Sequence, residues 1–257
     1  MIPHGAGKLG EALLNGKDTV ASTENSSPAD REPTGKPHVG ADTSAQRAAY
    51  WPVPLLRAVP LAALALVTAF TAAHSTAFGL ITFGAFAVLT ALLVGQYAAR
   101  TLTRTSLRGP VLGQAAISLA TGILALSVSG TREIGFLFLV VIIFAASTGV
   151  LELFAGLRTR GSFVGSTDLI VAGGLTALLA IVFVLIPPGY RQSFHDPDGV
   201  VRVLDASVVV IGVLGAYAAI LAVFLVIAGL SAKWAAQPSE SASDSIQAPA
   251  AESENTP

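Results

Sequence analysis

Glu152 is the residue of this chain whose setting points most directly to chemistry, because it lies inside a long run of apolar residues. A carboxylate within a hydrocarbon layer is costly and usually faces protein or water, where it can bind a proton or an ion. Arg57, near the start of another apolar run, is one possible partner, and a basic residue elsewhere or a proton would serve equally. We therefore interpret Glu152 and Arg57 as candidate functional residues within a membrane.

Both residues also have a structural interpretation. Glu152 lies about one and a half turns from the end of its predicted helix, so its side chain could reach the membrane surface or a neighbouring arginine. Arg57 lies close enough to a helix start to extend its guanidinium to the surface while its alkyl chain stays in lipid. The sequence leaves the functional and structural interpretations open.

A second set of polar residues lies in the segment 187–206, between two apolar runs. His195, Asp196 and Asp198 combine imidazole and carboxylate groups, which could bind a divalent cation or titrate at about pH 6. The Asp-Pro-Asp-Gly sequence among them is equally typical of a turn with solvated charges. His74, in an earlier short connection, is either a polar turn residue or a second titrating group. We keep all four as candidate pH-sensing residues and predict no metal site.

No catalytic or cofactor motif is found in the sequence. The Gly-Ala-Gly-Lys sequence at 5–8 resembles the end of a phosphate-binding loop, but Ile2 replaces its first glycine and Leu9 its serine or threonine. The chain contains no cysteine, which excludes disulfides, thiolate metal ligands and cysteine nucleophiles. We therefore expect a protein that is not an enzyme and has neither a cofactor nor a nucleic-acid partner.

The elements that position these residues are six apolar runs of about 19–24 residues each. About 20 apolar residues allow an α-helix to cross a hydrocarbon core about 30 Å thick. The chain is 53% hydrophobic and only 12% charged, which is too apolar for a soluble protein of this length. We predict an all-α polytopic membrane protein within residues 50–234. Its six transmembrane helices are expected at about 55–73, 77–97, 110–128, 134–157, 168–186 and 207–230.

The six predicted helices fall into three pairs that resemble copies of one helical hairpin. A shift of 58 residues places 57–100 on 115–158 without a gap and aligns Thr90 with Thr148. The third pair aligns more loosely because the segment 187–206 is inserted in it. Each hairpin would begin and end on the same side of the membrane, so the repeats would be parallel rather than inverted. Shared composition is the alternative explanation of the match.

Small residues four positions apart mark the helix faces that we expect inside the bundle. In lipid, helices associate through close packing, which small side chains allow. Gly173 and Gly174 offer a further contact. The spaced pairs are Ala145 with Gly149, Gly212 with Ala216, Gly215 with Ala219, and Ala218 with Ala222.

The two ends of the chain differ from its middle. Residues 1–49 are rich in small and polar residues and 235–257 are acidic, so neither can bury enough apolar surface to fold and both are predicted to be disordered. Basic residues concentrate in the connections 98–109 and 158–167. Basic connections favour the cytoplasmic side, which places both tails in the cytoplasm and the segment 187–206 outside.

One part of the sequence resembles a known family. AISLATGILAL is followed, after a short turn, by LVVIIFAASTGVLELFAGLRTR, in which Gly149 and Glu152 precede the basic Arg158. This unit, and less closely the whole of residues 55–233, resembles the HdeD family of small six-helix bacterial membrane proteins built from repeated hairpins. Leu64 and Val94 depart from the family pattern, because they stand where the first predicted hairpin should have glycine and glutamate. The long tails also look additional to the family's usual unit.

The resemblance implies a non-enzymatic protein of the bacterial inner (plasma) membrane with a role in envelope or acid stress. Its expected partners are the lipid bilayer and either another membrane protein or a second copy of itself. The alternative is a small transporter or channel in which Glu152 handles a proton or an ion. That function would need a polar path through the helices.

Overall fold

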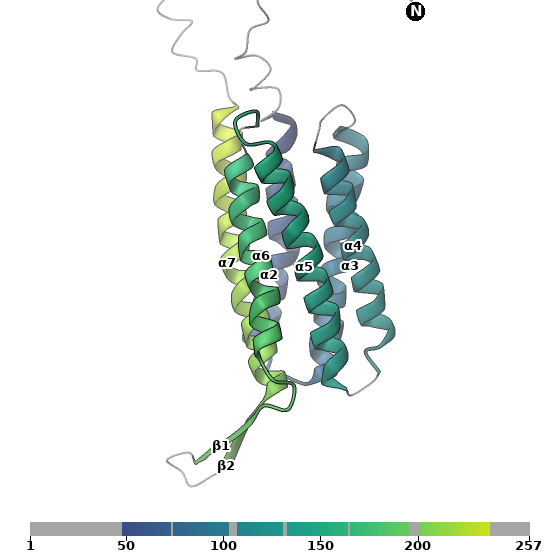
Figure 1. Cartoon of the computed structure of the whole chain (residues 1–257), viewed down its shortest axis with the longest axis vertical. Coiled ribbons are helices and arrows are strands. Elements are labelled where there is room, and N and C mark those ends of the chain that lie inside the picture. The colour runs from purple at the N-terminus through teal and green to yellow at the C-terminus, as the bar shows by residue number, and fades with distance from the viewer. Residues whose placement is uncertain are drawn as a thin grey trace, which may run out of the picture. The chain divides into compact units, whose positions relative to one another are not determined.

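The six apolar runs form six long helices in a computed structural model, which confirms the predicted all-α membrane fold (Figure 1). The structure describes residues 48–72, 74–102, 107–130, 133–163, 165–195 and 201–236. Most of both tails predicted to be disordered, residues 1–47 and 237–257, therefore lies outside the described residues. The helices are α2 (Pro52–Phe70), α3 (Thr76–Thr101), α4 (Arg108–Ser127), α5 (Ile134–Arg158), α6 (Ser166–Leu185) and α7 (Ala206–Ala235).

Each of these helices is long enough and apolar enough to cross a membrane. The 20 residues of α4 or α6 extend over about 30 Å, and the 30 residues of α7 over about 45 Å. Large apolar side chains are exposed on the outer faces, among them Leu66, Val150 and Ile220. So much exposed apolar surface fits a bundle surrounded by lipid. The chain is therefore a multi-pass integral membrane protein.

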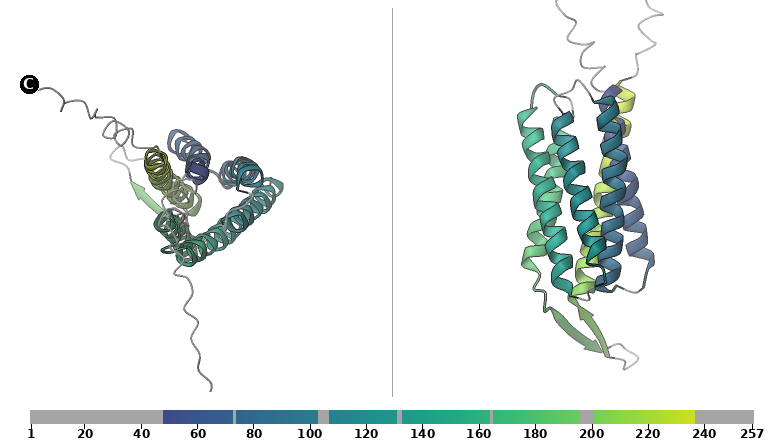
Figure 2. Two further views of the ribbon diagram at one scale, coloured as in Figure 1. Left: turned by 90° about the horizontal axis from the view of Figure 1, so that it is seen from above. Right: turned by 90° about the vertical axis from the view of Figure 1, so that its right-hand side faces the viewer.

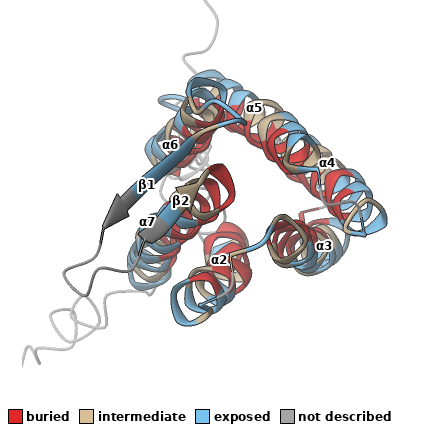
Figure 3. Ribbon diagram, turned by 90° about the horizontal axis from the view of Figure 1, so that it is seen from below, coloured by how far each residue is buried: buried red, intermediate tan, exposed pale blue. Residues whose placement is uncertain are grey.

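The helices pack as a ring in which each contacts the next and α7 contacts α2. Figure 3 shows α4, α5 and α6 along one side and α3, α2 and α7 along the other, with the buried residues facing inward. The most extensive contacts join α5 to α6, α3 to α4 and α2 to α7, whereas α6 and α7 contact each other least among ring neighbours. The closest packing thus joins helices from different predicted hairpins, and the predicted repeat of hairpins is not shown.

Two glycines bring the backbones of α5 and α6 close together. A Cβ atom on Gly149 would lie 2.6 Å from the backbone nitrogen of Ala177, and one on Gly173 would lie 2.7 Å from the backbone of α5. The prediction that these two glycines face into the bundle is confirmed. It is wrong for Gly212, Ala216 and Ala219, which are exposed, and a Cβ on Gly212 would meet nothing within 4 Å. In an alanine-rich chain, small residues also recur on surfaces that face lipid.

The connection between α6 and α7 contains a β-hairpin that the sequence analysis interpreted only as a turn. Strand β1 (Arg191–His195) pairs antiparallel with β2 (Val201–Asp205), so that Arg191 lies opposite Asp205 and His195 opposite Val201. The valine-rich β2 favours a strand, and the Pro-Asp-Gly sequence before it favours a chain reversal. Figure 2 shows the hairpin at the end of the bundle opposite the last turn of α7.

Candidate functional site

Arg57, Gln114 and Glu152 lie at nearly the same depth in the bundle. Arg57 is five residues after Pro52 at the start of α2, and Glu152 is six residues before Arg158 at the end of α5. Gln114 is six residues after the start of α4. At about 1.5 Å per residue, all three lie about 8–9 Å from the same end of the bundle. Consecutive helices run in opposite directions, which is why these distant positions in the sequence come to one level.

The three side chains form one buried cluster. The Arg57 guanidinium pairs with Oε1 of Glu152, and the Gln114 amide donates a hydrogen bond to the same oxygen. Only 7% of Arg57, 8% of Gln114 and 3% of Glu152 is exposed. Of the partners considered for Glu152, the structure selects Arg57. Because the guanidinium points into the bundle, Arg57 does not fit the interpretation of an anchor that reaches the surface.

Two buried polar atoms near this cluster have no hydrogen-bond partner in the described structure: Oε2 of Glu152 and Oγ of Ser118. Ser118 lies one turn beyond Gln114 on α4 and lines a cavity of about 10 Å³ that is also lined by Arg57. A cavity of this size and polarity has room for about one water molecule. A water there could satisfy Ser118, since buried polar atoms are almost always hydrogen-bonded.

The rest of the cavity lining is hydroxyl-rich. Thr90, Thr148 and Thr176 each donate to the carbonyl four residues earlier, over 2.8, 2.6 and 2.8 Å. The hydroxyl of Tyr217 lies 2.9 Å from that of Thr176 and completes a polar wall. The sequence did not indicate that these side chains belong to one site. A hydroxyl group in a helix commonly bonds to its own backbone, so its presence does not predict a contact with another helix. Thr90 and Thr148, aligned by the shift of 58 residues, do meet at one cavity.

The cluster can hold charge, but its charges balance. Arg57 and Glu152 carry opposite charges, so no net charge is buried, and the second carboxylate oxygen remains able to accept a proton or a hydrogen bond. Among the described residues, no group of three or more His, Asp and Glu side chains could hold a metal ion. The chemistry that this arrangement supports is proton or water binding within the bundle.

His74 joins helices at the opposite end of the bundle. Its ring nitrogens lie 3.3 Å from the carbonyl oxygen of Ala72 and 3.2 Å from that of Thr68, at the end of α2. Its own carbonyl accepts a 2.7 Å hydrogen bond from Ser207 on α7. Both ring contacts are hydrogen bonds only when both nitrogens carry a proton. The backbone carbonyl of His74 therefore links the connection after α2 to the start of α7.

Asp205 also lies at this end. The Ser207 hydroxyl lies 2.7 Å from its carboxylate and shares its one hydrogen between that carboxylate and the His74 carbonyl. The Val208 amide donates to the same carboxylate over 3.1 Å, and these contacts hold the pKa of Asp205 below its usual value. Of the other candidate pH-sensing residues, His195 ends β1 but its side chain is outside the described part. Asp196 and Asp198 lie outside the described residues altogether. Only His74 of the four candidates therefore has a described side chain, and the pH-sensing role of the group stays a prediction.

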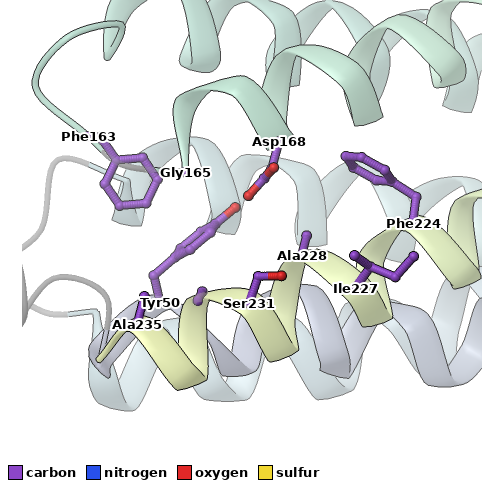
Figure 4. Close-up of a pocket in the computed structure, with 10 residues that line it drawn as sticks. Tyr50, Phe163, Gly165, Asp168, Phe224, Ile227, Ala228, Ser231 and Ala235 are labelled. Atoms are coloured by element: carbon purple, nitrogen blue, oxygen red, sulfur yellow. The ribbon is translucent and has the colours of Figure 1, made fainter. Parts of the chain in front are cut away.

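A larger pocket opens at the end of the bundle that holds the Arg57 cluster (Figure 4). It measures about 310 Å³ and lies between α6, α7 and the residues just before α2. Tyr50, Asp168 and Ser231 give it polar atoms, and Figure 4 shows the Tyr50 hydroxyl pointing toward the Asp168 carboxylate. Sequence reasoning missed this pocket. Asp168 stood at the expected start of a helix, where an acid is favourable for the helix itself.

These features define a six-helix membrane protein with a buried ion pair in its interior and an amphipathic pocket at one end. No protein-family model matches the chain, and neither a curated protein nor a solved structure matches it.

Proposed function

We propose that this chain is a non-enzymatic protein of a bacterial plasma membrane, of the HdeD type, which acts in the response of the cell envelope to acid or related stress. The observation that carries the proposal is the closed interior of the bundle. The cavity lined by its polar groups measures about 10 Å³, and the charges of Arg57 and Glu152 neutralise each other. Such an interior suits a stable membrane scaffold better than a path for a solute.

Survival after acid shock tests this function. Cells that lack the protein should survive a brief exposure to acid less well than the same cells supplied with the wild-type chain. A variant that breaks the bundle, such as Gly149→Leu, should fail to restore survival, since a leucine side chain would clash with the α6 backbone. Equal survival of all strains would remove the proposed role in acid stress.

We also propose that both chain ends lie in the cytoplasm. The concentration of arginines in the connections after α3 and α5 supports this orientation. Because the chain has no cysteine, single cysteines at positions 104 and 195 can be labelled without a background. A membrane-impermeant maleimide should label position 195 in intact cells and position 104 only after lysis. Labelling of both positions in intact cells would refute the orientation.

A small proton transporter or channel is a second candidate, and one observation favours it. Oε2 of Glu152 is buried and finds no partner in the described structure, so it is free to accept a proton. Its partners Arg57 and Gln114 both line the cavity that Ser118 also lines. A water in the cavity would bring a proton close to the carboxylate.

A flux assay separates the two candidates. Purified protein is reconstituted in liposomes that contain a pH-sensitive dye, and a pH gradient is imposed. Transport predicts proton flux above that of empty liposomes, loss of the flux in Glu152→Gln, and full flux in Glu133→Gln. Glu133 is an exposed acid at the opposite end of the bundle, which makes it a matched control. Flux equal to that of empty liposomes would reject the transporter and leave the scaffold.

A further inference from the structure

The pocket between α6 and α7 is polar at one end and apolar at the other, as a lipid molecule is. Asp168, Tyr50 and Ser231 lie near the helix ends, and Figure 4 shows Phe224 and Ile227 at the other end of the pocket. Phe224 and Ile227 are 11 and 8 residues before the end of α7, which puts them about 17 and 12 Å below it. The lining therefore changes from polar to apolar along the direction that crosses the membrane.

Asp168 places a carboxylate at the polar end of this pocket, and that carboxylate has no partner among the described residues. The side chain is half-buried in the first turn of α6 and makes no hydrogen bond or ion pair with any described residue. No lysine or arginine is among the described residues that line the pocket. A carboxylate held there without a partner is complementary to a cation that brings its own N–H donors.

The walls around the carboxylate are preformed. Tyr50 makes an edge contact with Phe163, with ring centroids 4.8 Å apart, and a Cβ on Gly165 would lie 3.0 Å from the Tyr50 ring. Tyr50 is buried, with only 6% of its surface exposed, so its hydroxyl is held near Asp168 rather than in solvent. Ligand pockets commonly combine apolar walls with a few such converging polar groups.

One wall of the pocket reaches the apolar outer surface of the bundle. Ile227 is 60% exposed on the surface that lipid covers, and α6 and α7 contact each other least among the neighbours in the ring. An amphiphile could thus enter sideways from the bilayer, with its head near Asp168 and its chain along Phe224.

We propose that this pocket binds a phospholipid with a primary ammonium head group, such as phosphatidylethanolamine, with the ammonium on Asp168 and the start of an acyl chain along Phe224 and Ile227. A primary ammonium offers three N–H donors, enough for the Asp168 carboxylate and the hydroxyls of Tyr50 and Ser231. The trimethylammonium of phosphatidylcholine has no N–H and could not make these bonds.

Native mass spectrometry of the full chain in detergent tests the proposal with two lipids that share the same acyl chains. The wild-type protein should bind phosphatidylethanolamine on the order of tenfold more tightly than phosphatidylcholine, the size of one charge-assisted hydrogen bond. Asp168→Asn should abolish that preference, while Asp168→Glu and the control Glu133→Gln should keep it. No preference in the wild-type protein, or an unchanged preference in Asp168→Asn, would overturn the proposal.

A second variant keeps the test decisive if Asp168→Asn does not fold. Ala232 lines the pocket, and Ala232→Phe would fill it without altering a charge, so binding of both lipids at this site should fall together. Undiminished binding would place the lipid elsewhere.

Two further measurements identify the source of the ammonium group. Water-soluble phosphoethanolamine should not compete with the lipid, and competition at equal concentration would make the site one for a soluble amine. Carbodiimide coupling should not join Asp168 to a lysine of this chain, and such a cross-link would show that a protein segment occupies the pocket instead.

Discussion

Replacing Glu152 by glutamine removes the only acidic partner that Arg57 has among the described residues. The guanidinium is 7% exposed, so it cannot recover its hydration without moving out of the bundle. Loss of one member of a buried ion pair typically costs about 3–5 kcal/mol, because the remaining charge is left uncompensated. We expect Glu152→Gln and Arg57→Gln each to lower the free energy of unfolding by about that amount.

The double variant separates the pair from its surroundings. With both residues changed to glutamine no charge is buried, and the loss should shrink to about 1–3 kcal/mol, the cost of imperfect hydrogen bonding around Gln114. The loss in the double variant should therefore be much smaller than the sum of the single losses, which is the signature of direct coupling. Reversible unfolding in mixed micelles with increasing dodecyl sulfate, followed by circular dichroism, measures all four proteins.

Two exposed residues serve as controls. Arg158, an exposed arginine at the end of α5, and Glu133 should each change stability by less than about 0.5 kcal/mol when replaced by glutamine. The reasoning is refuted if Glu152→Gln behaves like these controls. It is equally refuted if the losses of the single variants simply add in the double variant, because the pair would then contribute nothing as a pair.

The same titration checks other contacts. Gly173→Ala should lower the free energy of unfolding by about 1–3 kcal/mol, because its Cβ would meet the α5 backbone. Gly174→Ala would meet nothing within 4 Å and should raise the free energy of unfolding by up to about 1 kcal/mol. Equal effects of the two variants would contradict the packing of α5 on α6. Tyr217→Phe should cost about 1 kcal/mol through its lost hydrogen bond to α6, and unchanged stability would show that this bond is not formed. Asp205 has a lowered pKa, chiefly from the Ser207 hydroxyl, so its stabilisation is complete above about pH 4 and is lost as the pH falls further. Asp205 caps the start of α7, because its side chain accepts a hydrogen bond from the Val208 amide. The melting temperature of Asp205→Asn should therefore fall less steeply between about pH 5 and 2 than that of the wild type, and parallel curves would count against this cap.

The helices could be predicted from the sequence because lipid imposes a single requirement, an apolar run long enough to cross it. The same argument gave the depth of Arg57 and Glu152, since each lies a known number of residues from a helix end. It could not tell which helices are neighbours. Pairing of these two residues was consequently one of several alternatives, and only the ring order of the helices brings α2, α4 and α5 to one point.

Features that depend on neighbouring helices were harder to predict. Asp168 is favourable at a helix start by itself, so nothing in its local sequence indicates that a pocket lies beside it. Ser118 and Tyr217 are of interest because they line a cavity, and that cavity is formed by three or more helices together. The β-hairpin was missed for a different reason, because short strands of five residues lie within a segment rich in turn signals.

The two ends of the α6–α7 interface bear on the choice between scaffold and transporter. A proton or solute that reaches Glu152 must pass helices that are packed tightly wherever glycines bring backbones together, as Gly149 and Gly173 do between α5 and α6. The interface of α6 with α7 is the least extensive in the ring, so opening of the bundle would cost least there. At one end of it lies the proposed lipid pocket beside Asp168, and at the other Ser207 and His74 tie α7 to the end of α2. A lipid bound in that pocket would add contacts between α6 and α7, where the helices of the ring contact each other least. It would thereby favour the closed bundle, which is the state that a scaffold requires.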